Sequence, residues 1–227
     1  HFVPFWTRMV GVFEIARDVV GSRELGKIVS TIFRWQNPRP AGMPLTWRDD
    51  PGLSSAGTIA DVGSHAYDVV RWITGTEAAS VLAHGETLTP SKVDLGAINL
   101  EEALEWRAGE TSEEVHTRQG GTVDYASLSC RYANGAVGSY LLSHATFLRK
   151  HLAPELELHG TSASLSVDRW SGEVVLVSPD QKKSILEKVP DEGFGNRFGK
   201  WVFPSLAPIV RGEAQSGSHP DLEDGWI

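Results

Sequence analysis

The sequence has little cysteine and a deficit of positive charge. Its 227 residues include one cysteine, Cys130, which excludes an internal disulfide framework and is typical of a reducing compartment. Lysine and arginine total 21 against 29 acidic residues, and the net charge of -8 argues against nucleic acid or an anionic membrane as a partner. No apolar run approaches the roughly 18 residues of a membrane span. We therefore expect a soluble, cytoplasmic protein.

What remains is an ordinary globular composition, with 41% hydrophobic and 22% charged residues. A chain of 227 residues is long enough to bury a sizeable core. It starts at His1 within sequence that has the pattern of regular structure, and it stops at Ile227 without a polar tail. We expect residues 1–227 to form one domain that is a fragment of a longer protein.

Helical patterns lie early in the chain and strand patterns lie late. Apolar spacing predicts helices over Met9–Val20 and from Gly57 to about Gly75. β-Branched or alternating runs predict strands at 28–33, 79–88, 122–132, 138–145, 156–160, 163–167, 174–177 and 184–186. Asn134-Gly135 is the strongest hairpin signal. Tight connections between late strands indicate an antiparallel sheet, so we expect an α+β fold whose large, mostly antiparallel open sheet carries its helices on one face.

Two surfaces suggest association. The uncovered face of the sheet predicts homodimerisation, because an exposed mixed or apolar face usually marks an association site. The polar stretch 90–121 has one helical signal, Asn99 as N-cap with Glu102 three residues later. That stretch is either a mobile excursion or an oligomer contact.

The stretch from Gly57 to Asp68 is the best candidate for chemistry. In a helix, Asp61, His65 and Asp68 occupy positions i, i+4 and i+7 and project from one face. An imidazole held between two carboxylates suits proton transfer near neutral pH. Gly63 would leave room for a ligand or another backbone.

Two other interpretations of this stretch stay open. Pairs of aspartate and histidine on a helix are often surface contacts or caps. A metal site is also possible, but the second histidine of an H-E-x-x-H pattern is missing. We predict no metal.

Several segments together resemble the C-terminal domain of the glucose-fructose oxidoreductase / inositol dehydrogenase / rhizopine-catabolism (Gfo/Idh/MocA) family. They are Leu25-Gly26-Lys27-Ile28, Trp47-Arg48-Asp49, the D-x-G-x-H-x-x-D run within Gly57–Asp68, Val70–Gly75, Asn134-Gly135 and Leu158–Thr161. The resemblance covers nearly the whole chain, and the D-x-G-x-H-x-x-D run is fairly specific when it follows W-R at this distance.

The resemblance implies an NAD(P)-dependent oxidoreductase that dimerises or tetramerises through its open sheet. His65 would then be the catalytic acid/base for a substrate hydroxyl, and Asp61 would orient His65 and bind substrate. Asp68 and Tyr67 would contact or support the substrate, and Trp47 with Arg48 would close over the nicotinamide. For Trp47, simple core packing is an equal alternative. Other residues could line the pocket: Arg34, Trp35, Arg39, His144 and His151.

The chain departs from the family in two ways. No G-x-G-x-x-G follows a strand, so the Rossmann domain that binds NAD or NADP is absent from it. The lysine of the family's E-K-P motif has no counterpart either. We expect the fragment alone to be inactive.

The leading interpretation is the substrate-binding and catalytic half of an oxidoreductase for a sugar, polyol or inositol-like hydroxyl. A non-catalytic module for carbohydrate binding or dimerisation is the first alternative, and a metal-dependent hydrolase or lyase is the second.

Overall fold

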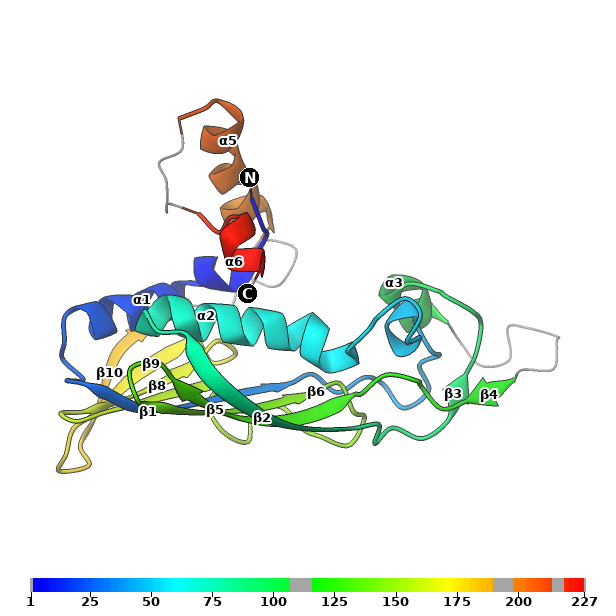
Figure 1. The fold of residues 1–227 in the computed structure, drawn as a ribbon, viewed down its shortest axis with the longest axis horizontal. Coiled ribbons are helices and arrows are strands. Elements are labelled where there is room, and N and C mark those ends of the chain that lie inside the picture. The colour runs from blue at the N-terminus through cyan, green and yellow to red at the C-terminus, as the bar shows by residue number, and fades with distance from the viewer. Residues whose placement is uncertain (1, 107–115, 190–197, 214–218, 227) are drawn as a thin grey trace.

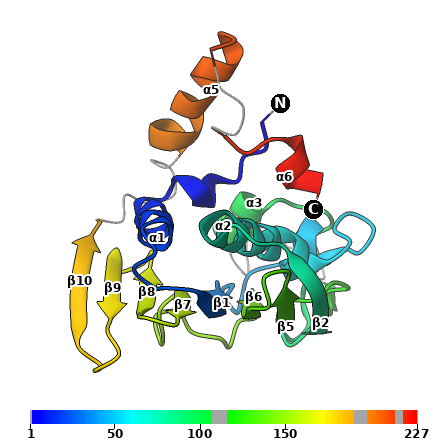
Figure 2. The same cartoon turned by 60° about the vertical axis from the view of Figure 1, so that its left-hand side comes forward.

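One broad sheet organises the protein. The computed structural model describes residues 2–106, 116–189, 198–213 and 219–226. Figure 1 shows this sheet beneath the helices, and in Figure 2 its strand order can be followed as β10-β9-β8-β7-β1-β6-β5-β2. The strands are β1 (Ile28–Gln36), β2 (Ala78–Glu86), β5 (Tyr125–Tyr132), β6 (Val137–Ser143), β7 (Leu156–Gly160), β8 (Ser164–Asp168), β9 (Glu173–Val177) and β10 (Lys183–Lys188). All neighbours are antiparallel except β1 and β6. The predicted α+β fold with a mostly antiparallel sheet is confirmed.

Two helices cover one face of this sheet, as predicted. Figure 2 shows α1 (Gly11–Gly21) and α2 (Ser64–Thr74) lying side by side above the strands. Phe13 of α1 and Val69 of α2 are completely buried, as is Phe33 of β1 between the layers. Burying each such side chain contributes about 1.5–3 kcal/mol. The other helical segments within the described residues are η1 (Trp6–Met9), η2 (Trp47–Asp49), η3 (Ile59–Gly63), α3 (Leu100–Glu105), η4 (Phe198–Val202), α5 (Phe203–Val210) and α6 (Leu222–Trp226).

Turn and capping residues in the sequence predicted where several helices and strands begin or end. Gly135 has φ +86° in the turn between β5 and β6, as the Asn-Gly pair predicts. Gly75 ends α2 in the left-handed region, with φ +67°. Asn99 and Glu102 form the predicted capping box of α3. The polar stretch also holds a ribbon of β3 (Lys92–Val93) and β4 (Thr117–Arg118), which the sequence did not reveal. Residues 107–115 of that stretch lie outside the described part.

The face of the sheet turned away from α1 and α2 has a mixed surface. Leu82 and Val137 lie on it with 77% and 49% of their surfaces exposed, beside the exposed Ser129 and Ser139. Association through this face stays a prediction. Among the described residues, no helix combines the length and the apolar character needed to cross a membrane.

Candidate active site

The chain enters its central helix through a wide turn. Gly57 has φ +48°, and a Cβ atom there would lie 2.1 Å from the carbonyl oxygen of Val123. Ile59–Gly63 then form the π-helical turn η3, and α2 starts at Ser64. A π turn bonds residues i and i+5, so it changes the angular spacing of Asp61 relative to the residues of α2. The predicted helix is therefore not regular but starts with a π turn.

Asp61 lies among two arginines and a histidine from three other segments. Its Oδ2 atom is 3.2 Å from Nε of Arg48, 3.7 Å from Nη2 of Arg39 and 3.5 Å from Nε2 of His144. Arg39 follows β1 and His144 follows β6. Because these strands are parallel, they end at the same edge of the sheet, and both residues lie there. Burial and the nearby Arg39 lower the pKa of His144 to about 4, although Asp61 opposes this effect. His144 is therefore neutral near pH 7.

His65 lies against an aromatic wall. Its ring centroid is 5.5 Å from that of Phe5, 5.8 Å from Trp6 and 6.1 Å from Trp35. Its Nδ1 atom is buried and has no hydrogen-bond partner among the described residues. Burial lowers the pKa of His65 from 6.5 to about 4; the charge of Asp61 raises it and that of Arg169 lowers it. A neutral imidazole with a nitrogen to spare can accept a proton.

Behind the aromatic wall lies a buried ion pair. Nη2 of Arg169 is 2.6 Å from Oε1 of Glu155, and both side chains are almost fully buried. The guanidinium also lies 4.3 Å from the ring centre of Trp35 and 5.1 Å from that of Trp6. These cation–π contacts connect the end of β8 to the wall beside His65.

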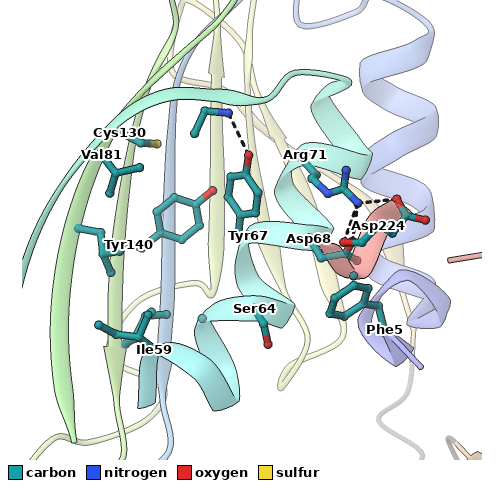
Figure 3. Close-up of a pocket in the computed structure, with 15 residues that line it drawn as sticks. Phe5, Ile59, Ser64, Tyr67, Asp68, Arg71, Val81, Cys130, Tyr140 and Asp224 are labelled. Carbon is teal, nitrogen blue, oxygen red and sulfur yellow. Dashed lines mark hydrogen bonds and ion pairs between the residues drawn. The ribbon is translucent and has the colours of Figure 1, made fainter. Parts of the chain in front are cut away.

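Tyr67 lies on another side of α2 from His65. His65 and Tyr67 are about 200° apart around a helix that turns 100° per residue. Oη of Tyr67 donates to Glu77 (2.7 Å) and accepts from the N–H of Ala78 (2.9 Å). Tyr67 and Asp68 line a cavity of about 440 Å³ between α2 and the strands β2, β5 and β6 (Figure 3).

The carboxylate of Asp68 is occupied by arginines. Its two oxygens accept from Nε and Nη2 of Arg8 at 2.7 and 2.5 Å, and Nη2 of Arg71 lies 3.3 Å away. The prediction that the imidazole lies between Asp61 and Asp68 is therefore wrong. Asp61 influences His65 from one side, and aromatic rings occupy the others.

Trp47 and Arg48 lie together in the turn η2, with Arg48 beside Asp61, and their contact with a nicotinamide stays a prediction. Thr46 caps their turn, η2, in a capping box with Asp49. The Arg48 guanidinium lies 4.4 Å from the ring centre of Trp47, and Trp47 is only partly buried. Trp47 is therefore not simply a core residue, because it is partly exposed and its ring contacts Arg48.

Two further expectations can be compared with the geometry. A Cβ atom on Gly63 would lie 2.9 Å from Cδ1 of Leu142, so the missing side chain lets a core residue approach the helix closely. Among the residues that the structure describes, no three His, Cys, Asp or Glu side chains gather in a way that could hold a metal ion.

The sequence missed several members of the site. Phe5, Trp6 and Arg169 carry no local signal that separates them from core or surface residues. His144, Trp35 and Arg39 were possible pocket residues, and the structure brings all three to the site. Arg34 and His151 instead line a different cavity of about 210 Å³ at the other face of the sheet.

The fold and the site define a class of domain. It has an open, mostly antiparallel sheet, two helices on one face, and an aspartate and a histidine where the central helix begins. The model for the GFO/IDH/MocA C-terminal domain matches residues 13–166, and the chain belongs to this family.

Individual relatives agree with this assignment. The chain is 27% identical over 218 residues to a levoglucosan dehydrogenase from Pseudarthrobacter phenanthrenivorans, covering 91% of this chain and 53% of the relative. The structure of a levoglucosan dehydrogenase in complex with NADH and levoglucosan has a TM-score of 0.73 at 20% identity, covering 100% of this chain and 60% of the other. An oxidoreductase domain protein from Kribbella flavida also gives 0.73 at 20% identity, covering 96% and 59%. The chain thus spans about half the length of the curated relative.

Proposed function

We propose that the chain is the substrate-binding and catalytic part of an NAD(P)-dependent oxidoreductase that acts on a hydroxyl of a sugar, polyol or inositol-like compound. Membership of the family supports this proposal, as does the relative whose structure contains NADH and levoglucosan. In this proposal residues 1–227 form one domain, and a dinucleotide-binding domain elsewhere in the parent protein completes the site. The 227 residues alone would then be inactive.

The observation that carries the proposal is the state of His65. Its imidazole is neutral near pH 7, its Nδ1 atom has no hydrogen-bond partner among the described residues, and Asp61 lies close enough to influence its pKa. The unprotonated imidazole is the form that can take a proton from a hydroxyl. The negative charge of Asp61 stabilises the imidazolium that results.

The chain's own groups also suit the cofactor and the substrate. A nicotinamide would supply the hydride chemistry when bound. Trp47 and Arg48 would contact it from this domain, and their position next to Asp61 supports this role. Phe5, which is only partly buried, offers an apolar ring for the C–H face of a sugar. Substrate contact by Tyr67 and Asp68 stays a prediction, because Tyr67 lies on another side of α2 and Arg8 already binds both carboxylate oxygens of Asp68.

The test uses nicotinamide absorbance with the full-length parent and a panel of sugars, inositols and anhydrosugars. We expect His65→Gln to lower kcat/KM by about 100-fold or more, the size of a general-base contribution. His84→Gln is the matched control, since His84 lies on β2 with 65% of its side chain exposed. Full activity in His65→Gln would overturn the role of His65.

Two other results would favour the alternatives. Sugar binding without turnover in wild type would indicate a carbohydrate-binding module. Activity that depends on added metal instead of nicotinamide would indicate a hydrolase or lyase.

We further propose a homodimer or homotetramer formed through the open sheet face. The exposed Leu82 and Val137 support this proposal, because large apolar side chains on a sheet face favour association. Light scattering should give a mass above that of the monomer at micromolar concentration, and Val137→Lys should reduce it. A monomeric wild type contradicts the proposal.

A further inference from the structure

The segment before α1 meets the start of α2 at two levels. At the first level, the Phe5 and Trp6 rings contact His65 at 5.5 and 5.8 Å between centroids. About one turn further along both elements, Arg8 meets Asp68 in a two-pronged ion pair of 2.7 and 2.5 Å. The aromatic contact and the ion pair thus join the same two elements, with the ion pair next to the wall that encloses His65.

The ion pair belongs to a wider charged network. Asp224 of α6 accepts from Arg8 at 2.8 Å and also from Arg71. Arg71 bonds Glu77 at 2.8 Å as well (Figure 3 shows the contacts of Arg71 with Asp68 and Asp224). Asp68 is 1% exposed, and both of its oxygens accept from Arg8. Its carboxylate is therefore committed to the protein itself.

The segment that carries Phe5 and Trp6 has little structure of its own. η1 has four residues and no side-chain cap at its start. Such a short 3₁₀ turn does not persist by local interactions alone. Its position therefore depends on tertiary contacts. Among these, the bidentate pair between Arg8 and the buried Asp68 fixes the geometry most strictly, because two parallel hydrogen bonds set both distance and orientation.

We propose that Asp68 and Arg8 are positioning residues that hold Phe5 and Trp6 against the imidazole of His65. Their importance for catalysis rests on the proposed function, whereas the positioning itself can be measured without turnover. In this view the second aspartate of D-x-G-x-H-x-x-D acts on His65 through an aromatic wall and not through its own charge.

The pKa of His65 reports whether Phe5 and Trp6 remain against its imidazole. The charged groups that influence His65 are Asp61 from η3 and Arg169 from the end of β8. The Phe5, Trp6 and Trp35 rings add no charge and exclude water. If Phe5 and Trp6 move away, water reaches the imidazole, and the pKa of His65 rises from about 4 toward its ordinary 6.5.

The test compares histidine titrations by NMR in the full-length protein. The His65 signal is assigned as the one lost in His65→Gln. The main variant combines Arg8→Met with Asp68→Leu, which removes one buried charge of each sign and so avoids an unpaired ion. We expect it to fold and to show a clearly raised His65 pKa. Glu77→Gln is the matched control, because it changes the network at Arg71 without touching Arg8, and there the His65 pKa should stay near 4.

A second variant keeps the proposal testable if the double variant does not fold. Arg8→Lys keeps the charge but cannot bond both carboxylate oxygens in a fixed plane. We expect a smaller rise of the His65 pKa in the same direction. An unchanged His65 titration in a folded double variant, or in Arg8→Lys if the double variant does not fold, overturns the proposal even where His65 proves essential for turnover.

Discussion

The carboxylate of Asp61 lies 3.5 Å from Nε2 of His144, a residue that follows a strand far away in the sequence. The same oxygen is 3.2 Å from Nε of Arg48. Asp61 therefore does more than accompany His65 on one helix. It is the common partner of a second histidine and two arginines, which fix its orientation at the edge of the sheet.

Removing the charge of Asp61 should affect His65 electrostatically. Asp61→Asn leaves the shape nearly unchanged, but the pKa of His65 should fall below its value of about 4, because Asp61 raises it. Under the proposed function, kcat/KM of the full-length enzyme should drop by about 10–100-fold. NMR titration and initial rates measure the two effects. Asp180→Asn is the control, since Asp180 is an exposed side chain. Equal behaviour of both variants would contradict the assignment.

Acid should destabilise this protein through two buried histidines. The folded-state pKa values of His65 and His144 are about 4, below the ordinary 6.5. As the pH falls from 6.5 to 4, the unfolded chain takes up protons at these sites before the folded one does, so the free energy of unfolding decreases. The loss approaches about 3 kcal/mol per histidine at the lower end.

Urea unfolding at about pH 7 and about pH 5 measures this loss. His144→Gln should reduce the difference between the two conditions, whereas His84→Gln should leave it unchanged. A wild-type stability that is the same at both pH values would disprove the explanation.

The turn into η3 depends on Gly57. Alanine there must adopt φ +48°, and its Cβ would lie 2.1 Å from the carbonyl oxygen of Val123. Gly75 is a matched control, because it has φ +67° and a Cβ atom there would meet no other atom within 4 Å. We expect Gly75→Ala to cost about 1–2 kcal/mol from the left-handed backbone alone. Gly57→Ala should cost clearly more, because the clash adds to that strain. Equal thermal unfolding midpoints would contradict this.

The buried pair behind the aromatic wall should matter more than a similar pair near the surface. Glu155→Gln removes the carboxylate charge 2.6 Å from Arg169, where both side chains are at most 2% exposed. A loss of about 3–5 kcal/mol is expected for breaking such a pair. Glu157→Gln faces Arg34 at 2.7 Å with both side chains over 20% exposed, and it should cost about 1 kcal/mol or less. Denaturant unfolding of the two variants compares the losses.

Much of the fold could be predicted because its signals are local. Apolar periodicity located α1 and α2, Asn134-Gly135 located a hairpin, and Asn99 with Glu102 located the start of α3. The parallel pairing of β1 with β6 could not be predicted in this way, since turn residues specify only neighbouring strands. That pairing is decisive for the site, because it brings Arg39 and His144 to the same edge.

The sequence by itself determined the family and the pair of Asp61 and His65, because a motif of fixed spacing lies on one continuous segment. It also determined that the late strands pair mainly as hairpins. Tertiary structure alone decided that Asp61 lies beside Arg48 and His144, that Phe5 and Trp6 pack against His65, and that Asp68 bonds Arg8. The reason is physical: helix and turn propensities act between near neighbours, whereas burial and ion pairing select partners from distant parts of the chain.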